Sequence, residues 1–439
     1  MTTVKAVRGT RDLLPPETEL WNRIEATARK VFARYNFGEI RTPIFEDTGL
    51  FARSVGEETD IVSKEMYTWE DRARAQSEKA QSLTLRPENT AGVVRAYIEH
   101  KLGESGQLQK LYYIGPQFRR ERPQKGRYRQ FWQIGAEVIG PPFAGSESPL
   151  RDAEVLEMLA TLLDELRITG WTLELNSVGS AADRARYNDV LRTALAEVAP
   201  KMCGDCQRRA ITNPLRVLDC KVPEDQPIIA TLPKITDSLD QESKDHFAAV
   251  TAALEAAGVP YQLNPRLVRG LDYYTRTTFE FTHGGLGAQN ALLGGGRYDG
   301  LSEAIGGPKA PGIGFAMGLD RLVLTLQGQP QTLLDTVYVN TPADAYIAPL
   351  GEAQNAPALA LARELRKSDL RVEIGDGTFR LKKSFEIANK LAWRIVILGE
   401  DEVRSGILTV KNFVTGVQSK VPREELAARL KKPAGELKE

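Results

Sequence analysis

Two separated segments carry the residue types that a nucleotide site needs. The first, Phe118-Arg-Arg-Glu-Arg-Pro-Gln-Lys-Gly-Arg-Tyr-Arg-Gln-Phe131, is rich in arginine and is predicted to form a hairpin. The second, Leu267-Val-Arg-Gly-Leu-Asp-Tyr-Tyr-Thr-Arg-Thr-Thr-Phe-Glu-Phe281, places an arginine close to two tyrosines. Guanidinium groups are fixed cations that can donate two parallel hydrogen bonds to the oxygens of a triphosphate. Tyrosines suit a polar small molecule, so the sequence predicts a pocket that holds both.

A third motif, Gly294-Gly-Gly-Arg-Tyr-Asp-Gly300, is predicted to be a glycine-rich turn near these segments. A simple turn is the alternative interpretation of its glycines, because a glycine-rich turn alone is weak evidence of nucleotide binding. The Arg-Tyr-Asp-Gly sequence that follows favours a place at the pocket.

The second arm of the predicted hairpin separates polar from apolar side chains. With a period of two, one face holds Phe131, Gln133, Gly135 and Glu137, and the other holds Trp132, Ile134, Ala136 and Val138. A half-buried strand usually presents its polar face to water. On residue type alone that interpretation is favoured. The hairpin's arginines, together with the family resemblance given below, favour the alternative, in which the polar face lines a ligand site.

The elements that must position these residues require more than one domain. At 439 residues the chain exceeds what one hydrophobic core usually supports, so two or three domains are expected. Hydrophobic residues at 42% and charged residues at 26% are typical of a folded soluble protein. The N-terminus lacks the apolar core of a signal peptide, and three cysteines cannot pair fully, so we expect a cytoplasmic protein. A net charge of zero argues against a protein that coats nucleic acid.

Hydrophobic periodicity and the positions of proline and glycine predict the elements of the first domain. The expected helices follow Pro15-Pro16 as far as Tyr35, follow Leu83–Thr90 as far as His100, and span Asp152 to Leu166. The expected extended segments are Glu39 to Phe45 and the hairpin arms Lys110 to Arg120 and Arg129 to Ile139, whereas Arg72 to Gln81 is expected to be a loop. Between Asn176-Ser-Val-Gly179 and Leu263 the composition becomes helical and charged, which predicts an insertion at about 180–260.

Beyond residue 335 the pattern predicts a second, small α/β domain. Short apolar strands at Val337 to Val339, Arg371 to Ile374 and Ile395 to Leu398 alternate with helices at Ala358 to Lys367 and Leu381 to Leu391. We expect domains at 1–325 and 336–439, joined by a linker at 326–335.

Cys203-Gly-Asp-Cys206 and Cys220 raise the possibility of zinc. Structural zinc normally needs four ligands, and the nearest histidine, His246, is distant in the sequence. We therefore expect three reduced structural thiols and no metal site. The histidines show no paired metal spacing, and no catalytic role is assigned to them.

Several separated motifs together resemble the histidyl-tRNA synthetase family of class II aminoacyl-tRNA synthetases. The N-terminal signature is Arg8-Gly-Thr-Arg-Asp-Leu-Leu-Pro15, motif 2 is Leu85-Arg-Pro-Glu88 with the hairpin, and motif 3 is Gly314-Phe-Ala-Met-Gly-Leu-Asp-Arg321. The resemblance implies an α+β fold, in which a catalytic core with an antiparallel sheet and a helical insertion precedes an α/β anticodon-binding domain. It also implies a homodimer, in which the extended segment from Glu39 to Phe45 would be motif 1 at the interface.

The family's functional residues are carried over by position. For histidine, the resemblance implies that Glu88, Thr90 and Gln133 hold the α-amino group, that Glu137 and Tyr274 address the imidazole, and that Tyr273 and Tyr298 border the pocket. For ATP, it implies Arg119 and Arg269 at the α-phosphate, Arg127 and Arg321 at the terminal phosphates, Glu121 at the adenine amino group and Phe131 as a stacking platform. Arg119, Arg269 and Arg321, together with Mg²⁺, would supply the catalytic charge.

The implied activity is that of a histidine–tRNA ligase. The histidine carboxylate would attack the α-phosphorus of ATP, and the resulting histidyl-adenylate would transfer histidine to the 3′ end of tRNA(His). A principal rival is the regulatory paralogue of ATP phosphoribosyltransferase, a binding module that lacks the tyrosine segment and the anticodon domain. Another is a synthetase for proline or threonine, which the pairing of Glu137 with Tyr274 disfavours.

The match has departures. The family commonly has histidine at Arg120 and Trp132, and often glycine at Asn89. The parity of the strand predicts that Trp132 alters packing, whereas Asn89 lies between two expected substrate contacts. In the C-terminal domain, an amphipathic helix with Arg380, Lys382, Lys383, Lys390 and Arg394 around it would supply the phosphate contacts to the anticodon.

Overall fold

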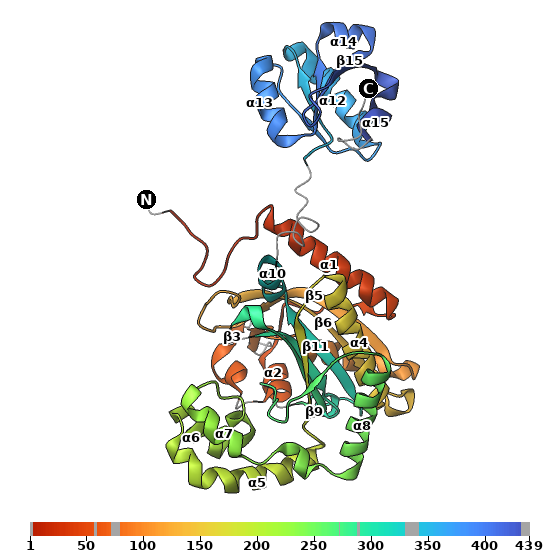
Figure 1. Ribbon diagram of the computed structural model, residues 1–439. Helices are drawn as coiled ribbons and strands as arrows, with labels where there is room; N and C mark the ends of the chain where they lie inside the picture. The colour runs from red at the N-terminus through yellow and green to blue at the C-terminus, as the bar shows by residue number, and fades with distance from the viewer. Residues whose placement is uncertain are drawn as a thin grey trace. The chain divides into compact units, whose positions relative to one another are not determined.

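The chain divides into two compact units, Met1–Tyr338 and Val339–Glu439, and each unit has its own hydrophobic core. The computed structural model describes residues 3–56, 59–71, 80–271, 273–287, 290–329 and 342–431. Figure 1 labels the elements of both units. None of the helices in these ranges has the length and apolar character that crossing a membrane requires.

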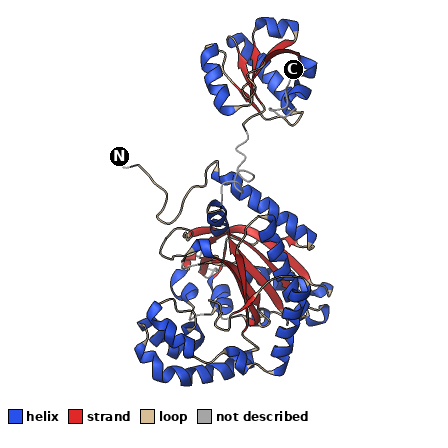
Figure 2. Ribbon diagram, viewed as in Figure 1, coloured by secondary structure: helices blue, strands red, loops and turns tan. Residues whose placement is uncertain are grey.

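A largely antiparallel sheet forms the centre of the first unit. Among the described residues its strands, in spatial order, are β1 (Gly38–Glu39), β5 (Gln109–Phe118), β6 (Gln130–Ile139), β11 (Gly312–Gly318), β10 (Ala291–Arg297), β9 (Thr275–His283), β7 (Trp171–Ser177) and β8 (Gln262–Leu263). Neighbours are antiparallel except β1 with β5 and β7 with β8. Figure 2 shows this sheet surrounded by helices, which confirms the predicted α+β class.

Helices pack around this sheet through apolar stripes. They are α1 (Glu17–Arg34), α2 (Thr48–Val55), α3 (Thr90–Glu99), α4 (Pro149–Glu165), α8 (Gln241–Ala256), α9 (Leu301–Ala304) and α10 (Leu319–Gln327). In α1, Leu20, Ile24, Ala28 and Val31 recur at helical spacing, and all four are buried in the core shared with α4 and the sheet. The predicted first helix is therefore confirmed. Helix α10 includes the first two residues of the expected linker, and the linker from residue 330 onward lies outside the described residues.

Strands β5 and β6 form the hairpin predicted from the arginine-rich segment. They pair in antiparallel register along their whole lengths. Three residues of the predicted apolar face, Ile134, Ala136 and Val138, lie in the hydrophobic core. The side chain of Glu137 on the other face is fully buried. At Glu137 both faces of the strand are therefore covered, whereas Phe131 and Gln133 on the same face are half-buried and line a cavity.

The prediction of a turn at Gly294-Gly-Gly296 is wrong. These glycines lie inside strand β10, between β9 and β11, and the turn comes later, at Asp299 and Gly300. Large side chains pass close to the strand at these positions. They leave no room for a Cβ atom, which explains why the strand has glycine there. A Cβ at Gly294 would lie 2.5 Å from Nη1 of Arg269, and one at Gly296 would lie 2.8 Å from Cδ1 of Tyr274. The glycines make room for the pocket residues.

The expected extended segment from Glu39 to Phe45 contributes to strands of two sheets. Its start forms β1, which pairs parallel with β5, and its end begins β2 (Phe45–Asp47). A small antiparallel sheet in the order β2, β4 (Gln81–Leu85) and β3 (Tyr67–Asp71) follows. The expected loop from Arg72 to Gln81 lies outside the described residues over 72–79, and Gln81 begins a strand.

The region of the expected insertion has a core of its own. Helices α5 (Ala181–Val198), α6 (Gly204–Thr212) and α7 (Gln226–Thr231), with short 3-10 turns between them, bury a separate apolar cluster. Helix α8 also falls within residues 180–260, but it packs against α4, and its Val250 and Leu254 belong to the core of the main sheet. Helix α8 is therefore not part of the separately packed cluster.

The second unit is a small α/β domain. Its sheet has the order β13 (Val372–Ile374), β12 (Ala345–Pro349), β14 (Arg394–Leu398), β15 (Ile407–Asn412) and β16 (Gln418–Pro422). The helices are α12 (Asn355–Arg366), α13 (Leu381–Leu391), α14 (Glu400–Ser405) and α15 (Arg423–Lys431). Strand β12 is parallel to β13 and β14, and the last two strands are antiparallel. The expected strand at Val337 to Val339 lies outside the described residues.

One of the basic residues assigned to the surface around α13 is buried. Arg394 is 1% exposed, and its Nη1 donates a hydrogen bond to the backbone oxygen of Leu430 at 3.0 Å. Its placement on the basic surface is therefore wrong, because it belongs to the central strand β14. The other four, Arg380, Lys382, Lys383 and Lys390, are exposed.

Candidate active site

Glu137 is the centre of a buried cluster of carboxyl and hydroxyl groups. Its Oε1 accepts a hydrogen bond from the Thr90 hydroxyl at 2.7 Å, and its Oε2 accepts one from the Tyr298 hydroxyl at 2.8 Å. Thr90 begins α3, Tyr298 follows β10, and Glu137 lies in β6. Three separate motifs of the sequence therefore meet at one carboxyl group.

A second carboxyl group, that of Glu88, lies at the start of α3. It accepts hydrogen bonds from the backbone N–H groups of Thr90 at 2.7 Å and Ala91 at 3.0 Å. These first amides of a helix have no partner within the helix, so a carboxylate is well placed to bind them. Burial raises the pKa of Glu88, and the two amides oppose that shift.

Burial also raises the pKa of Glu137, to about 8. The hydrogen bonds from Thr90 and Tyr298 favour the ionised form, whereas the nearby Glu88 disfavours it. A positive group that entered the cluster would stabilise both carboxylates. The cluster is therefore suited to a ligand that brings positive charge and hydrogen-bond donors.

Tyrosine rings enclose this cluster. The ring centroids of Tyr273 and Tyr274 are 4.7 Å apart, and those of Tyr273 and Tyr298 are 6.0 Å apart. The hydroxyl of Tyr113 and the Oε1 of Gln133 are buried, and neither has a hydrogen-bond partner among the described residues. Buried polar atoms in folded proteins are nearly always paired, so these two are available to a ligand.

Glycines of β11 provide the space for this cluster. A Cβ on Gly314 would collide with the carboxyl group of Glu137, and one on Gly312 would collide with the ring of Tyr298. Neither position could carry a larger side chain without displacing the cluster. The glycines of the Gly314 to Arg321 motif thus have a steric role at the pocket.

The expected phosphate-binding arginines line one cavity of about 360 Å³. Its walls include Arg119, Glu121, Arg127, Phe131, Gln133, Arg269 and Arg321, which come from the hairpin, the tyrosine segment and α10. Gln133 and Glu137 lie on the same face of β6, so the cavity and the buried cluster are adjacent along that strand. The structure thus brings all the sequence-predicted site residues into one region.

Acidic residues already engage part of the positive charge of this cavity. Arg269 Nη1 lies 2.5 Å from Oε1 of Glu280, and Arg127 Nη1 lies 3.3 Å from Oε2 of Glu121. Burial and the nearby Arg127 lower the pKa of Arg321. A bound anion would reverse that effect, so the cavity is suited to a polyanion.

The guanidinium of Arg119 lies between the segment that carries Glu88 and the ring of Phe131. Its Nε donates a hydrogen bond to the backbone oxygen of Pro87 at 2.9 Å, next to Glu88. Its Cζ lies 5.3 Å from the centroid of the Phe131 ring. These two contacts hold the charge beside a flat apolar surface.

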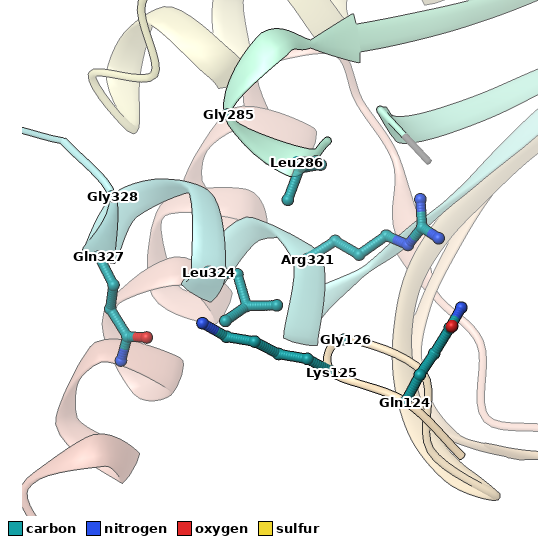
Figure 3. A pocket seen from close by; sticks show the side chains of 9 residues that line it. All are labelled: Gln124, Lys125, Gly126, Gly285, Leu286, Arg321, Leu324, Gln327 and Gly328. Carbon is teal, nitrogen blue, oxygen red and sulfur yellow. The ribbon is translucent and has the colours of Figure 1, made fainter. Parts of the chain in front are cut away.

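A neighbouring cavity of about 550 Å³ extends the site toward the hairpin tip. It shares Gly126 and Arg321 with the first cavity. Figure 3 shows Arg321 at the start of α10 and the tip residues Gln124 and Lys125 around this space. The arginine therefore faces both cavities.

Several charged residues that line the first cavity have no role in the sequence prediction. They include Asp60, Glu65, Arg216, Glu280 and Asp320. Asp60 Oδ2 lies 3.4 Å from Nη2 of Arg216, although 156 residues separate the two in the sequence. Nothing in the local pattern around Asp60 or Arg216 indicates this contact. Glu280 lies within the Leu267–Phe281 segment, but only its contact with Arg269 in the fold assigns it to the cavity.

Models of known protein families match both units of the chain. A family model described as histidyl-tRNA synthetase matches residues 9–322. The chain belongs to the histidyl-tRNA synthetase family. A second model, described as an anticodon binding domain, matches residues 344–433.

Similar members of this family cover nearly the whole chain. The chain is 72% identical over 429 residues to a histidine–tRNA ligase of Koribacter versatilis (strain Ellin345), across 97% of this chain and 95% of that protein. It is 56% identical over 430 residues to a histidine–tRNA ligase of Solibacter usitatus (strain Ellin6076), across 97% and 99%. The crystal structure of apo S. aureus histidyl-tRNA synthetase has a TM-score of 0.78 at 37% identity, and covers 98% of this chain and 100% of that chain.

The departures from the histidyl-tRNA synthetase pattern lie at the edge of the site. Trp132 is partly buried and packs against the core, and its ring meets that of Trp21 edge to face with centroids 6.0 Å apart, so the predicted packing role is confirmed. Asn89 Oδ1 accepts a hydrogen bond from the Thr42 hydroxyl at 2.7 Å, which directs that oxygen toward the segment between β1 and β2. Arg120 lies over the ring of Tyr67.

Arg297 of the glycine-rich motif points away from the pocket. It is fully buried and forms ion pairs with Asp152 at 2.9 Å and Asp299 at 2.8 Å. Its Nη2 also donates a hydrogen bond to the backbone oxygen of Ser146 at 2.6 Å. The two residues of the motif therefore have different roles. Arg297 anchors the motif to α4, and Tyr298 contacts Glu137.

Proposed function

We propose that this protein is a histidine–tRNA ligase whose active site is the pocket formed by the buried cluster and the arginine cavity. The observation that carries the assignment is the adjacency of the two along one face of β6. Glu137 supports a polar, cationic ligand at one end, and Gln133 lies at the cavity of arginines at the other. A single molecule that spans them has an amino acid at one end and a nucleotide at the other, as an aminoacyl-adenylate does.

For histidine, we assign the α-amino group to Glu88, Thr90 and Gln133. An ammonium group brings three donors, and the unpaired Oε1 of Gln133 supplies one matching acceptor. The imidazole is assigned to Glu137 and Tyr274, with Tyr273 and Tyr298 at its border. Because imidazole has two inequivalent nitrogens, polar partners at both reject isosteric side chains that would leave those partners buried and unpaired.

For ATP, we assign the α-phosphate to Arg119 and Arg269 and the terminal phosphates to Arg127 and Arg321. Phe131 is the stacking surface for the adenine and Glu121 the partner of its amino group. Ion pairs with Glu280 and Glu121 hold two of these arginines in place before the nucleotide binds. Each guanidinium still has donors that can reach phosphate oxygens.

Mg²⁺ is assigned to the bound nucleotide. Magnesium sites in such enzymes use one or two carboxylates together with the substrate's phosphates. Glu65 and Glu280 line the cavity and offer oxygens of this kind. The ion would neutralise part of the phosphate charge.

The chemistry needs positioning more than proton transfer. The histidine carboxylate is already ionised near neutral pH and attacks the α-phosphorus, which forms histidyl-adenylate and releases pyrophosphate. Arg119, Arg269 and Arg321 stabilise the negative charge that develops on the phosphate oxygens. A ribose hydroxyl at the 3′ end of tRNA(His) then attacks the adenylate carbonyl, and AMP leaves.

We further propose that the enzyme is a homodimer that works in the cytoplasm, where tRNA is charged. An apolar patch on the small sheet supports the dimer. Phe45 is 53% exposed and Trp69 39% exposed, and their rings lie 6.1 Å apart across that sheet. Adjacent exposed aromatic residues of this size are typical of an interface. The exposed basic residues around α13 are assigned to the anticodon stem of the tRNA.

ATP–pyrophosphate exchange with each of the twenty amino acids tests the proposed function. Exchange should require histidine, should collapse in Arg269→Ala and should persist in Arg192→Ala. The control removes an exposed arginine that pairs with its helix neighbour Asp189. Exchange with a different amino acid would refute the specificity, and folded wild-type protein without any exchange would instead support the regulatory paralogue. Aminoacylation of tRNA(His) then tests the second step.

A further inference from the structure

We propose that Cys203, Cys206, Cys220 and Asp225 form a structural zinc site in the helical insertion. Each residue offers one ligand atom, and the four atoms all lie within 4.8 Å of one another. The cysteines supply only three ligands, which is why the sequence alone predicts free thiols. Asp225 supplies the fourth, which completes the ligand number that structural zinc requires.

The distances within two pairs of ligand atoms fit a tetrahedral ion. Zinc–sulfur bonds of about 2.3 Å place two sulfurs of a tetrahedral site roughly 3.8 Å apart. The Sγ atoms of Cys203 and Cys220 are 3.9 Å apart, and the Sγ of Cys220 is 3.2 Å from Oδ2 of Asp225. A disulfide would require a separation of about 2 Å, so the sulfurs are arranged for coordination and not for a covalent bond.

The backbone supports this arrangement. Cys203 and Cys206 bracket the first turn of α6, Cys220 follows the short turn Pro214–Val217, and Asp225 ends the turn that leads into α7. The backbone N–H of Cys203 donates to both carboxylate oxygens of Asp225, at 3.1 and 3.3 Å. Such outer contacts orient metal ligands. Thiolate ligands select zinc over the hard cations calcium and magnesium.

The burial of the ligands and the small core of the insertion both favour a bound ion. Cys206 is 0% exposed, Cys220 5% and Asp225 2%, so the carboxylate lies among sulfurs inside a small apolar cluster. A buried carboxylate is costly unless it is paired or coordinates a metal. The three helices of this region bury a limited core, and a bound metal is a common way to stabilise such a unit.

The site also connects the insertion to the candidate active site. Helix α6 carries Arg209, and the turn before Cys220 carries Arg216. Both arginines lie 3.4 Å from Oδ2 of Asp60, which lines the arginine cavity together with Arg216. An ion that fixes α6 to this turn therefore fixes Arg216 at the cavity wall. Its loss would loosen that wall as well as the insertion.

The test measures metal directly on the full-length protein. Protein purified under reducing conditions without chelator should contain about one zinc per chain by elemental analysis. Replacement by Co²⁺ should produce the visible absorption of tetrahedral cobalt together with sulfur-to-cobalt charge-transfer bands. Cys206→Ser and Asp225→Asn should lose most of the metal, and Asp205→Asn should retain it. Asp205 is the matched control because it lies on the same helix with a side chain that is 62% exposed.

Two results would overturn the proposal. In the first, wild-type protein from which the metal has been removed is titrated with zinc and binds the ion no more tightly than Asp225→Asn does. The other is a cobalt spectrum without charge-transfer bands. Because Cys206→Ser could fail to fold, release of zinc from the wild type by a mercurial thiol reagent gives a readout that needs no variant. One equivalent released as the thiols are blocked supports the site, and no release refutes it.

Discussion

The carboxyl group of Glu137 and the hydroxyl group of Tyr298 are joined by a hydrogen bond of 2.8 Å across 161 residues of sequence. Both side chains are buried, and a Cβ at Gly312 or Gly314 of the intervening strand would prevent their contact. The hydrogen bond holds one carboxylate oxygen in a fixed direction. In the proposed function, that oxygen faces the imidazole.

Tyr298→Phe should weaken the binding of histidine while leaving that of ATP unchanged. The variant removes the donor to Glu137 but keeps the ring. A hydrogen bond to a charged group contributes about 1.5–3 kcal/mol, so the KM for histidine should rise roughly tenfold or more. ATP–pyrophosphate exchange at varied histidine and varied ATP separates the two effects.

Tyr187→Phe is the matched control for that variant. Its buried hydroxyl donates a hydrogen bond to the backbone oxygen of Pro233 at 2.7 Å, inside the insertion. The same atom is lost, and the same kind of ring remains. If both variants raised the KM for histidine equally, the Tyr298 hydroxyl would have no special role in the pocket.

Glu137 should make the unliganded protein less stable as the pH rises. Burial raises its pKa to about 8 from an ordinary value of 4.5, so the folded state binds a proton that the unfolded state has released. This stabilising contribution is fully present below the unfolded pKa and is lost as the pH rises through the folded pKa. Urea unfolding between about pH 4.5 and 8 should show the decline, and Glu137→Gln should flatten it. An equal slope in wild type and variant would assign the effect to other groups.

Gly294→Ala should impair catalysis through Arg269. The added Cβ would lie 2.5 Å from Nη1 of that arginine, so the guanidinium must move. A displacement of about 1 Å near a reacting centre lowers the rate by roughly 10²-fold. Gly300→Ala is the matched control, because a Cβ there meets no atom of the described structure within 4 Å. Pre-steady-state adenylate formation measures both, and comparable rates for the two would contradict the steric role.

The local pattern of β6 was sufficient to predict its two faces. Strict alternation placed Ile134, Ala136 and Val138 on one side, and the structure buries those residues in the core. The chemistry of the polar face was accessible only because several motifs occurred together, since Glu137 alone is compatible with a solvated strand. The residues of the motifs and the order of the motifs along the chain therefore indicate the family and the fold.

Other parts of the site depend on contacts that no local pattern encodes. Gly294-Gly-Gly296 has the composition of a turn, but the side chains of Arg269 and Tyr274 require glycine inside a strand. The fourth ligand, Asp225, is separated from Cys206 by a helix and two turns, and its own sequence neighbourhood has no metal spacing. Tertiary packing decides these features, so the local sequence does not predict them.

Asp152→Ala should destabilise the first unit without involving ligand binding. It would leave Arg297 buried without its main carboxylate, and breaking a buried pair in this way costs about 3–5 kcal/mol. Glu104→Ala removes an ion pair of the same unit whose two side chains are both 71% exposed, so its effect should be below about 1 kcal/mol. Urea denaturation compares the two. A small effect of Asp152→Ala would mean that Asp299 and the Ser146 carbonyl suffice to hold Arg297.

Arg216→Ala should raise the KM for ATP more than the KM for histidine. Its Nη2 is held by Asp60, whereas its buried Nη1 has no hydrogen-bond partner among the described residues and lies at the cavity wall near Gly270. A phosphate or ribose oxygen of the nucleotide is the partner that the proposed function supplies. Loss of one hydrogen bond from a charged group corresponds to about 1.5–3 kcal/mol, so a rise of roughly tenfold or more is expected. Arg208→Ala, which removes an exposed arginine of α6 that pairs with Asp205, should change neither constant. If Arg216→Ala left the KM for ATP unchanged, Arg216 would be confined to holding the insertion against Asp60.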